Sequence, residues 1–274
     1  MADMRPAVVA GTWYPEREAQ LAAAVDAHMA AVGAGTATRC PRAIIAPHAG
    51  LMYSGPVAAY GYALAAGCPY TAVVLVGPSH FVGFRGVSIW PRGAWETPFG
   101  AIPIAEPLAA DLAATPLVSE HPAAHGREHS LEMQLPFLGR LLPDTPIVPL
   151  VMGYQDRETA MGLGDALARV LAARPGEQVL LVASSDLSHY EDAATAADLD
   201  AVVIRHVAAL DAAGLMSALE DDPRHACGGG PIVAVLHAAS LLGCTRADVL
   251  RYADSGDVSG DKTSVVGYMA AAIW

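Results

Sequence analysis

The stretch RAIIAPHAGLMYSGPVAAYGYAL, residues 42–64, joins a short apolar run to a histidine and then to a helix. The run AIIA has the composition of a buried strand and ends at Pro47, and His48 follows directly. A helix is predicted to open at Ser54, a plausible N-cap, with Pro56 in its first turn. The stretch therefore predicts a strand that delivers a histidine to the loop before a helix.

A second strand is predicted to end in the same way. In TAVVLVGPSHFVG, residues 71–83, His80 follows the aliphatic run. Ligand sites of open α/β sheets lie beyond the carboxyl ends of the strands, so His48 and His80 are expected at one sheet edge. The functional hypothesis is a pair of imidazole metal ligands, and the alternative is two histidines that bond local backbone and shape turns. Histidine is a common ligand of iron, copper and zinc, but two are too few.

Cys227 is the leading candidate for a third ligand. It lies in HACGGGPI, residues 225–232, before three glycines that would let the backbone come close to a ligand. A helix opening at Pro231 would favour the thiolate, which is the form that binds metal. The alternative is an inert buried cysteine before a flexible loop.

Two further segments carry groups suited to acid–base chemistry. Asp186 and His189 follow the predicted strand 178–184. Asp186 could be a carboxylate that orients the imidazole of His189, and the pair could then transfer protons. The alternative is that Asp186 caps a helix and His189 lies on the surface. His129 and Glu132 lie one helical turn apart, so both could face one cleft, or they could form a capping arrangement.

The other polar side chains are predicted to be structural. Asp254 lies in a Gly/Ser-rich loop after a strand and is only a weak site candidate. No serine lies in a GxSxG elbow, so a serine hydrolase is not indicated. Structural roles are expected for His28, His121, His125, His206, His225 and His237.

The pattern of the whole chain predicts one α/β domain spanning residues 1–274. Aliphatic runs alternate with Ala-rich helical patterns, which is typical of a mixed, mostly parallel central sheet flanked by helices. The predicted strands lie near 42–47, 72–77, 86–90, 146–152, 178–184, 248–253 and 264–270. The predicted helices lie near 16–32, 54–66, 106–114, 129–142, 156–173, 194–211 and 231–242, and 91–103 is expected to be a loop or hairpin.

Composition excludes several classes of partner. Hydrophobic residues make up 53% of the 274 and charged residues 16%, so we expect a homo-oligomer to cover some apolar surface. The formal net charge of −12 argues against nucleic acid and anionic membrane surfaces as partners. The N-terminal residues do not resemble a signal peptide, and no apolar run is long enough to span a bilayer.

The cysteines predict a reduced, cytoplasmic protein. Cys40, Cys68, Cys227 and Cys244 are far apart and form no CxxC, so neither a disulfide framework nor a zinc ribbon is expected. Apart from Cys227, the cysteines are expected to be inert.

Eight motifs in order along nearly the whole chain resemble the MEMO family (mediator of ErbB2-driven cell motility), whose prokaryotic members are called AmmeMemoRadiSam system protein B. The motifs are AGTWYP at 10–15, APHAG at 46–50, YSG at 53–55, GPSH at 77–80, TPFG at 97–100, EHSLEMQLPF at 128–137, SSDLSHY at 184–190 and CGGGPI at 227–232.

The resemblance implies a fold like the class III extradiol (LigB-type) dioxygenases. It also implies an iron or copper site, which in animal relatives uses two histidines and a cysteine. By motif, these ligands are His48, His80 and Cys227, and the pocket positions fall on His129, Asp186 and His189. Expected partners are a small-molecule substrate or peptide ligand, with a radical-SAM protein and an AMMECR1-like protein as companions.

Two departures limit what the resemblance implies. Animal members have bulkier residues after the cysteine, so a more open pocket mouth is expected here and peptide binding is not assumed. The dioxygenases use a carboxylate where Cys227 is predicted, and a softer thiolate favours copper(I) or alters the redox potential of iron. Ring cleavage therefore does not follow from the fold.

Three functional hypotheses follow. The leading one is a mononuclear Fe(II) or copper protein that oxidises a small molecule with O₂, in which His189 and His129 act as acid–base groups and Asp186 orients them. The second is a scaffold whose pocket binds a peptide or small ligand without turnover. The third is a metal-independent hydrolase with Cys227 as nucleophile.

Overall fold

Four strands built from aliphatic residues form the centre of the main sheet in the computed structural model, which describes residues 4–33 and 39–274. They are β2 (Ala43–Ala46), β9 (Val179–Ser184), β3 (Ala72–Pro78) and β8 (Ile147–Met152). Neighbours in this group pair in parallel, and every residue of the four strands is buried. Burial on both faces explains why these strands read as continuous apolar runs rather than alternating ones.

The sheet continues on both sides of this parallel centre, mainly through antiparallel pairs. Its order is β10-β12-β2-β9-β3-β8-β4-β7, with β11 paired to β12. The added strands are β4 (Val87–Ile89), β7 (Val118–Ser119), β10 (His189–Glu191), β11 (Ala247–Asp254) and β12 (Val265–Ile273). A separate small sheet consists of β1 (Met4–Arg5), β5 (Ala94–Thr97) and β6 (Gly100–Pro103). The predicted mixed sheet is confirmed.

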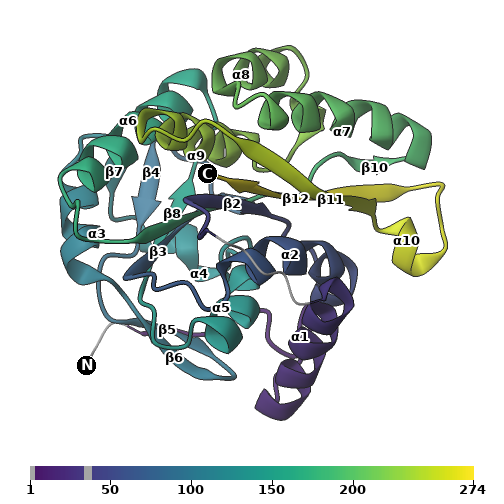
Figure 1. Cartoon of the computed structure of the whole chain (residues 1–274), viewed down its shortest axis with the longest axis horizontal. Coiled ribbons are helices and arrows are strands. Elements are labelled where there is room, and N and C mark those ends of the chain that lie inside the picture. Colours follow the sequence, from purple (N-terminus) through teal and green to yellow (C-terminus); the bar gives the residue numbers. More distant parts are fainter. Residues whose placement is uncertain (1–3, 34–38) are drawn as a thin grey trace.

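Helices cover both faces of the sheet (Figure 1). The longer ones are α1 (Glu18–Val32), α2 (Leu51–Ala65), α3 (Glu106–Ala113), α6 (Arg157–Ala172), α7 (Ala193–Ala208), α8 (Ala212–Asp221) and α9 (Gly229–Leu241). The short ones are α4 (Pro122–Gly126), α5 (Leu135–Leu141), α10 (Gly256–Ser259) and the 3₁₀ turns η1 (Glu132–Gln134) and η2 (Pro223–His225). Helix α2 packs on β2 and β12, with α1 and α5 against it, whereas α9 packs on β9 and β3 with α6 and α8 behind it.

Two helix starts differ from the prediction. Helix α2 begins at Leu51 rather than Ser54, because the Gly50 carbonyl already accepts the amide of Ser54. Ser54 is not the cap, since its hydroxyl donates to the Ala49 carbonyl at 2.7 Å. In place of the predicted helix 129–142, the chain first forms a turn and then the 3₁₀ turn η1, and the α-helix proper is the short α5. No helix in the described ranges is long and apolar enough to cross a bilayer.

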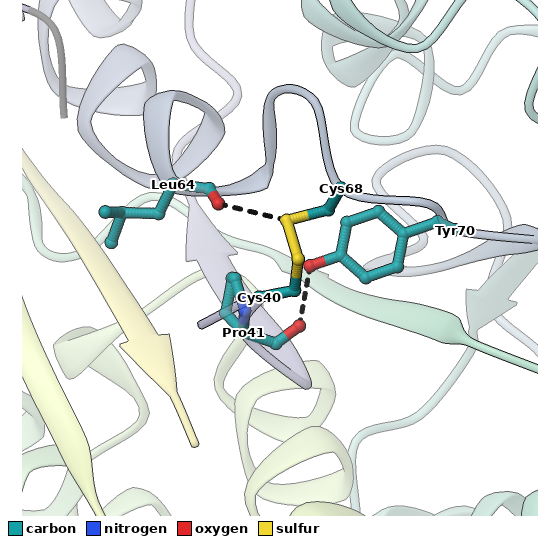
Figure 2. Close-up of a disulfide and its surroundings, with 5 residues drawn as sticks. All are labelled: Cys40, Pro41, Leu64, Cys68 and Tyr70. Carbon is teal, nitrogen blue, oxygen red and sulfur yellow. Dashed lines mark hydrogen bonds between the residues drawn. A yellow bond between two sulfur atoms is a disulfide. The ribbon is translucent and has the colours of Figure 1, made fainter. Parts of the chain in front are cut away.

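The structure corrects the prediction that the chain has no disulfide. Cys40 and Cys68 are bonded to each other, with their Cα atoms 5.8 Å apart (Figure 2). Cys40 precedes β2 and Cys68 follows α2, so the bond links the two ends of one strand–helix unit. Spacing alone could not indicate the pair, because the two residues are 28 apart and belong to no motif.

This disulfide should stabilise the fold measurably. Closing a loop of 28 residues removes chain entropy worth about 3–4 kcal/mol from the unfolded state. We therefore expect the C40S/C68S double variant to lose about that much unfolding free energy in urea titrations. Reductant should destabilise the wild-type protein similarly and leave the double variant unchanged. Equal stability of oxidised and reduced wild-type protein would contradict this.

Candidate metal centre

Three strand ends bring chemically active side chains to one edge of the sheet. His48, His80 and Asp186 each lie two residues beyond the end of β2, β3 and β9. Because these strands are parallel and adjacent, their carboxyl ends meet. All six residues predicted for the site line one cavity of about 580 Å³ at this edge: His48, His80, His129, Asp186, His189 and Cys227.

The hydrogen bonds of His48 define its tautomer. Its Nδ1 lies 2.9 Å from the Ser184 hydroxyl, and that hydroxyl donates its one proton to the Ser130 carbonyl at 2.6 Å. Gln134 donates its amide N–H to Ser184 at 2.7 Å and also to the Pro47 carbonyl. Ser184 can therefore only accept from His48, so Nδ1 carries the proton and the bare Nε2 is left for the cavity.

Glu128 orients His80 in a comparable way. The Nδ1 of His80 lies 2.8 Å from Glu128 Oε1, and the backbone amide of His80 donates to Oε2 at 2.6 Å. The amides of His129 and Ser130 also donate to this carboxylate, which is completely buried. Burial alone would raise the pKa of Glu128, but the bonds from His80 and Ser130 lower it to about 2. A carboxylate that holds Nδ1–H leaves Nε2 free, as in many metal sites.

Three imidazoles converge as a result. One ring nitrogen each of His48, His80 and His129 lies within 4.8 Å of the other two. Cys227 joins this group beside His48, with Sγ 3.3 Å from Nε2. The geometry thus offers both His129 and Cys227 as partners for the two strand-end histidines.

Burial in the cavity disfavours the charged forms of His48, His129 and Cys227. Burial, assisted by His80, lowers the pKa of His48 to about 3. Burial, with His48 and His80, lowers the pKa of His129 to about 4. Burial and the nearby Asp186 raise the pKa of the Cys227 thiol, against the expected effect of the helix N-terminus. The imidazoles of His48 and His129 are therefore in their ligand form at neutral pH, and the thiol of the metal-free protein is protonated.

Asp186 and His189 complete the cavity wall. Asp186 Oδ1 accepts the backbone amides of His48 and Ala49 at 2.6 and 3.2 Å. Burial raises the pKa of Asp186, and these bonds only partly offset the effect. His189 Nδ1 donates to the Leu187 carbonyl at 2.8 Å, which again leaves Nε2 free. Both residues can exchange protons with a molecule in the cavity.

Comparison with known proteins agrees with this architecture. The sequence profile described as Memo-like protein matches residues 5–272. The chain is 39% identical to a MEMO1 family protein of Methanosarcina mazei, over 99% of both chains. It is 38% identical to a MEMO1 family protein of Methanothermobacter thermautotrophicus, over 96% of this chain and 98% of the relative.

The chain belongs to the Memo family. Among solved structures, the fold resembles that of the uncharacterized protein JW3007 of Escherichia coli, with a TM-score of 0.56 and 19% sequence identity. That likeness covers 84% of this chain and 99% of the other, and at such low identity it bears on the fold alone.

The glycines that follow Cys227 in this Memo family chain pack closely against the protein itself. A Cβ on Gly228 would lie 2.6 Å from the Ser184 carbonyl oxygen, and one on Gly229 would lie 2.6 Å from the Leu219 side chain. The glycines thus allow α9 to pack closely against β9 and α8. This close approach to the protein requires glycine at both positions, whether or not a ligand also binds nearby.

Glu132 does not face the cleft, which was one of the two arrangements considered for it. It is completely buried and is hydrogen-bonded to the N-terminal arm, residues 5–14, of which Thr12 and Trp13 line the cavity. Arg5 donates to Glu132 at 2.6 Å, and Tyr14 and the amide of Val8 donate to it at 2.9 Å. The arm carries Trp13, whose ring lies 4.3 Å from that of His129. Glu132 therefore holds the wall of the cavity in place.

Sequence reasoning missed the residues that orient the ligands. Glu128, Ser184 and Gln134 stand in the quoted motifs, but their partners are 48 to 136 residues away in the sequence. The sequence carries no signal for these pairings beyond the fact that Glu128 directly precedes the candidate His129 and Ser184 lies two residues before the candidate Asp186. Asp254, the weak candidate, instead accepts from Lys262 and Gly256 within a turn.

Removing the charge of Glu132 should destabilise the protein strongly. In E132Q the Arg5 guanidinium stays buried without its full counter-charge, so we expect a loss of about 3–5 kcal/mol in unfolding free energy. The matched control is E220Q, which removes an exposed partner of Arg157 and should leave the urea midpoint unchanged. A small effect of E132Q would show that the arm is not anchored by this ion pair.

Stability should fall on mild acidification of the metal-free protein. The pKa values of His48 and His129 in the folded state lie below the ordinary value of 6.5, so the unfolded chain binds more protons. Their contribution is complete above pH 6.5 and declines by about 1.4 kcal/mol per pH unit per histidine as the pH falls. Urea titrations from pH 6.5 to 5 in chelator should show this, with a shallower slope in H48Q. A flat profile would contradict it.

Proposed function

We propose that this Memo family protein is a mononuclear redox-metal protein that uses Fe(II) or copper to oxidise a small molecule with O₂. The observation that carries the proposal is the convergence of His48, His80 and His129 within 4.8 Å at one sheet edge. Imidazoles in this arrangement suit iron, copper and zinc. We also propose that the protein is cytoplasmic, as its sequence predicts.

The residues present fit such a metal. His48 and His80 each have Nδ1 bound to a buried acceptor, which orients the ring and leaves Nε2 for coordination. The cavity of about 580 Å³ leaves room for a substrate beside the metal. The metal would supply Lewis-acid and one-electron chemistry that the side chains lack.

Cys227 and His129 are the two candidates for the third ligand. The sequence favours Cys227, whose sulfur already contacts His48 at 3.3 Å. A bound metal would displace its proton, and the thiolate would favour copper(I). His129 would instead give an all-imidazole site and leave Cys227 beside it. Whichever residue does not bind metal remains at the cavity wall.

The other groups fit proton transfer. His189 presents a bare Nε2, and Asp186 keeps one oxygen free of backbone bonds, so both can accept or donate a proton at a bound substrate. His129 would share this role if Cys227 is the third ligand. Asp186 also fixes the backbone of His48 and so orients the first ligand.

A binding function without turnover is the second candidate, favoured by the mouth of the cavity. Trp13, Met52 and Tyr190 line the cavity and remain 38%, 62% and 78% exposed. Exposed apolar side chains around a concave site are typical of ligand or peptide capture. The hydrolase hypothesis has less support, because burial raises the pKa of the Cys227 thiol and disfavours the nucleophilic thiolate.

Metal analysis of anaerobically loaded protein tests the proposal. We expect about one iron or copper per chain, since the site offers a single set of three ligands. H48A and H80A should each abolish binding. E128Q should weaken binding about 10- to 100-fold, because it disturbs the carboxylate that orients His80. Nitric oxide added to the iron form should give an EPR signal if a coordination position is open.

The matched variants C227A and H129A identify the third ligand, since only one of them should lose the metal. H237A, which alters an exposed pair with Asp165, serves as the control and should retain it. Wild-type protein without stoichiometric metal would overturn the proposal and leave ligand binding as the function to pursue. Metal binding without O₂ uptake across a screen of phenols would overturn the oxidase part alone.

A further inference from the structure

A second cavity, of about 300 Å³, lies at the opposite edge of the sheet from the histidines. Cys40 and Arg42, which line it, lie just before β2, and Gln178 lies just before β9. Trp274 also lines it and follows β12, which runs antiparallel to β2. These positions mark the amino ends of the parallel strands. The proposed metal chemistry uses none of these residues.

The cavity brings three of the four cysteines together. Cys40, which is bonded to Cys68, lines it together with the free thiol of Cys244. Cys40 and Cys244 are both only partly buried, so the cavity gives small molecules and solvent access to them. A free thiol and a disulfide sulfur that share one small cavity are the two reactants of thiol–disulfide exchange.

The charge of the cavity suits a thiolate. Arg39 and Arg42 also line it, and within the described ranges neither forms an ion pair with a carboxylate. Unpaired guanidiniums are notable in a chain with a formal net charge of −12. Burial raises the pKa of the Cys244 thiol, while Arg42 and Arg39 act to lower it. The net shift is upward, so the thiolate is a minor form of Cys244 at neutral pH, and the arginines increase the fraction that can attack a disulfide.

We propose that this cavity is a thiol–disulfide exchange site in which Cys40 pairs alternately with Cys68 and with Cys244. The Cys244 thiolate attacks the Cys40 sulfur, a Cys40–Cys244 bond forms, and the Cys40–Cys68 bond breaks. Cys244 gives its proton to solvent, and the released Cys68 thiolate takes one up. The number of disulfides is unchanged, so no external oxidant or reductant takes part.

The surroundings of Cys68 fit its role as the leaving group. Cys40 lines the cavity and Cys68 does not, so Cys40 is the half of the disulfide that we expect the Cys244 thiolate to attack. The Cys68 sulfur lies 3.5 Å from the Leu64 carbonyl in the last turn of α2 (Figure 2). Once released, the Cys68 thiol can donate to that carbonyl and cap the helix end. Disulfides in reducing compartments are mostly transient and redox-active, which agrees with exchange at this site.

Disulfide mapping of C68S tests the proposal. The folded variant is equilibrated anaerobically in a glutathione redox buffer, quenched with N-ethylmaleimide, digested and analysed by mass spectrometry. We expect the peptide holding Cys40 to be linked to the one holding Cys244, with fragmentation excluding Cys227 as the partner. If Cys40 and Cys244 are instead alkylated or separately glutathionylated, the proposal is wrong.

Wild-type protein gives a second test that does not depend on the variant folding. The same mapping should find a minor Cys40–Cys244 fraction beside the Cys40–Cys68 form, and C244S should show only the latter. Absence of the Cys40–Cys244 peptide from wild-type protein across buffer potentials would overturn the proposal. In R39Q/R42Q, iodoacetamide should label Cys244 several-fold more slowly, with the labelling of Cys227 as internal control.

Discussion

Parallel pairing of β2, β9, β3 and β8 is the constraint on which both cavities depend. It brings the carboxyl ends of these strands to one edge, and His48, His80 and Asp186 follow three of those ends directly. It also brings the amino ends to the opposite edge, where Cys40 and Arg42 precede β2. Because all four strands are buried, neither edge can shift without disturbing the core.

Buried acceptors convert this shared edge into an organised site. Glu128 and Ser184 each bind the Nδ1 of a different histidine, and each is itself held by further hydrogen bonds. Desolvation lowers the pKa of His48 and of His129, so both rings are neutral at neutral pH, which is the form that can bind a metal ion. Orientation and desolvation act together, so the ligands are prepared before any ion arrives.

Local patterns predicted the features that local forces determine. Continuous aliphatic runs identified the central strands, and the histidines after them marked the right edge. The disulfide was missed because Cys40 and Cys68 meet only once α2 packs on the sheet. The position of Glu132 stayed open between two alternatives, because both assumed a regular helix where the chain forms a turn and η1. The roles of Glu128 and Ser184 depend on distant partners, which no periodicity reveals.

The long sequence separations within the site set an order of events during synthesis. A chain emerges from its N-terminus, so the arm that lines the cavity is made first, yet its anchor Glu132 follows more than a hundred residues later. His80 is made 48 residues before Glu128, and His48 is made 136 residues before Ser184. Histidines on the nascent chain therefore lack the partners that orient them. If the protein binds a metal as proposed, selective binding must wait until Ser184 of β9 has been made and the sheet has closed, and until Cys227 has been made if it is the third ligand.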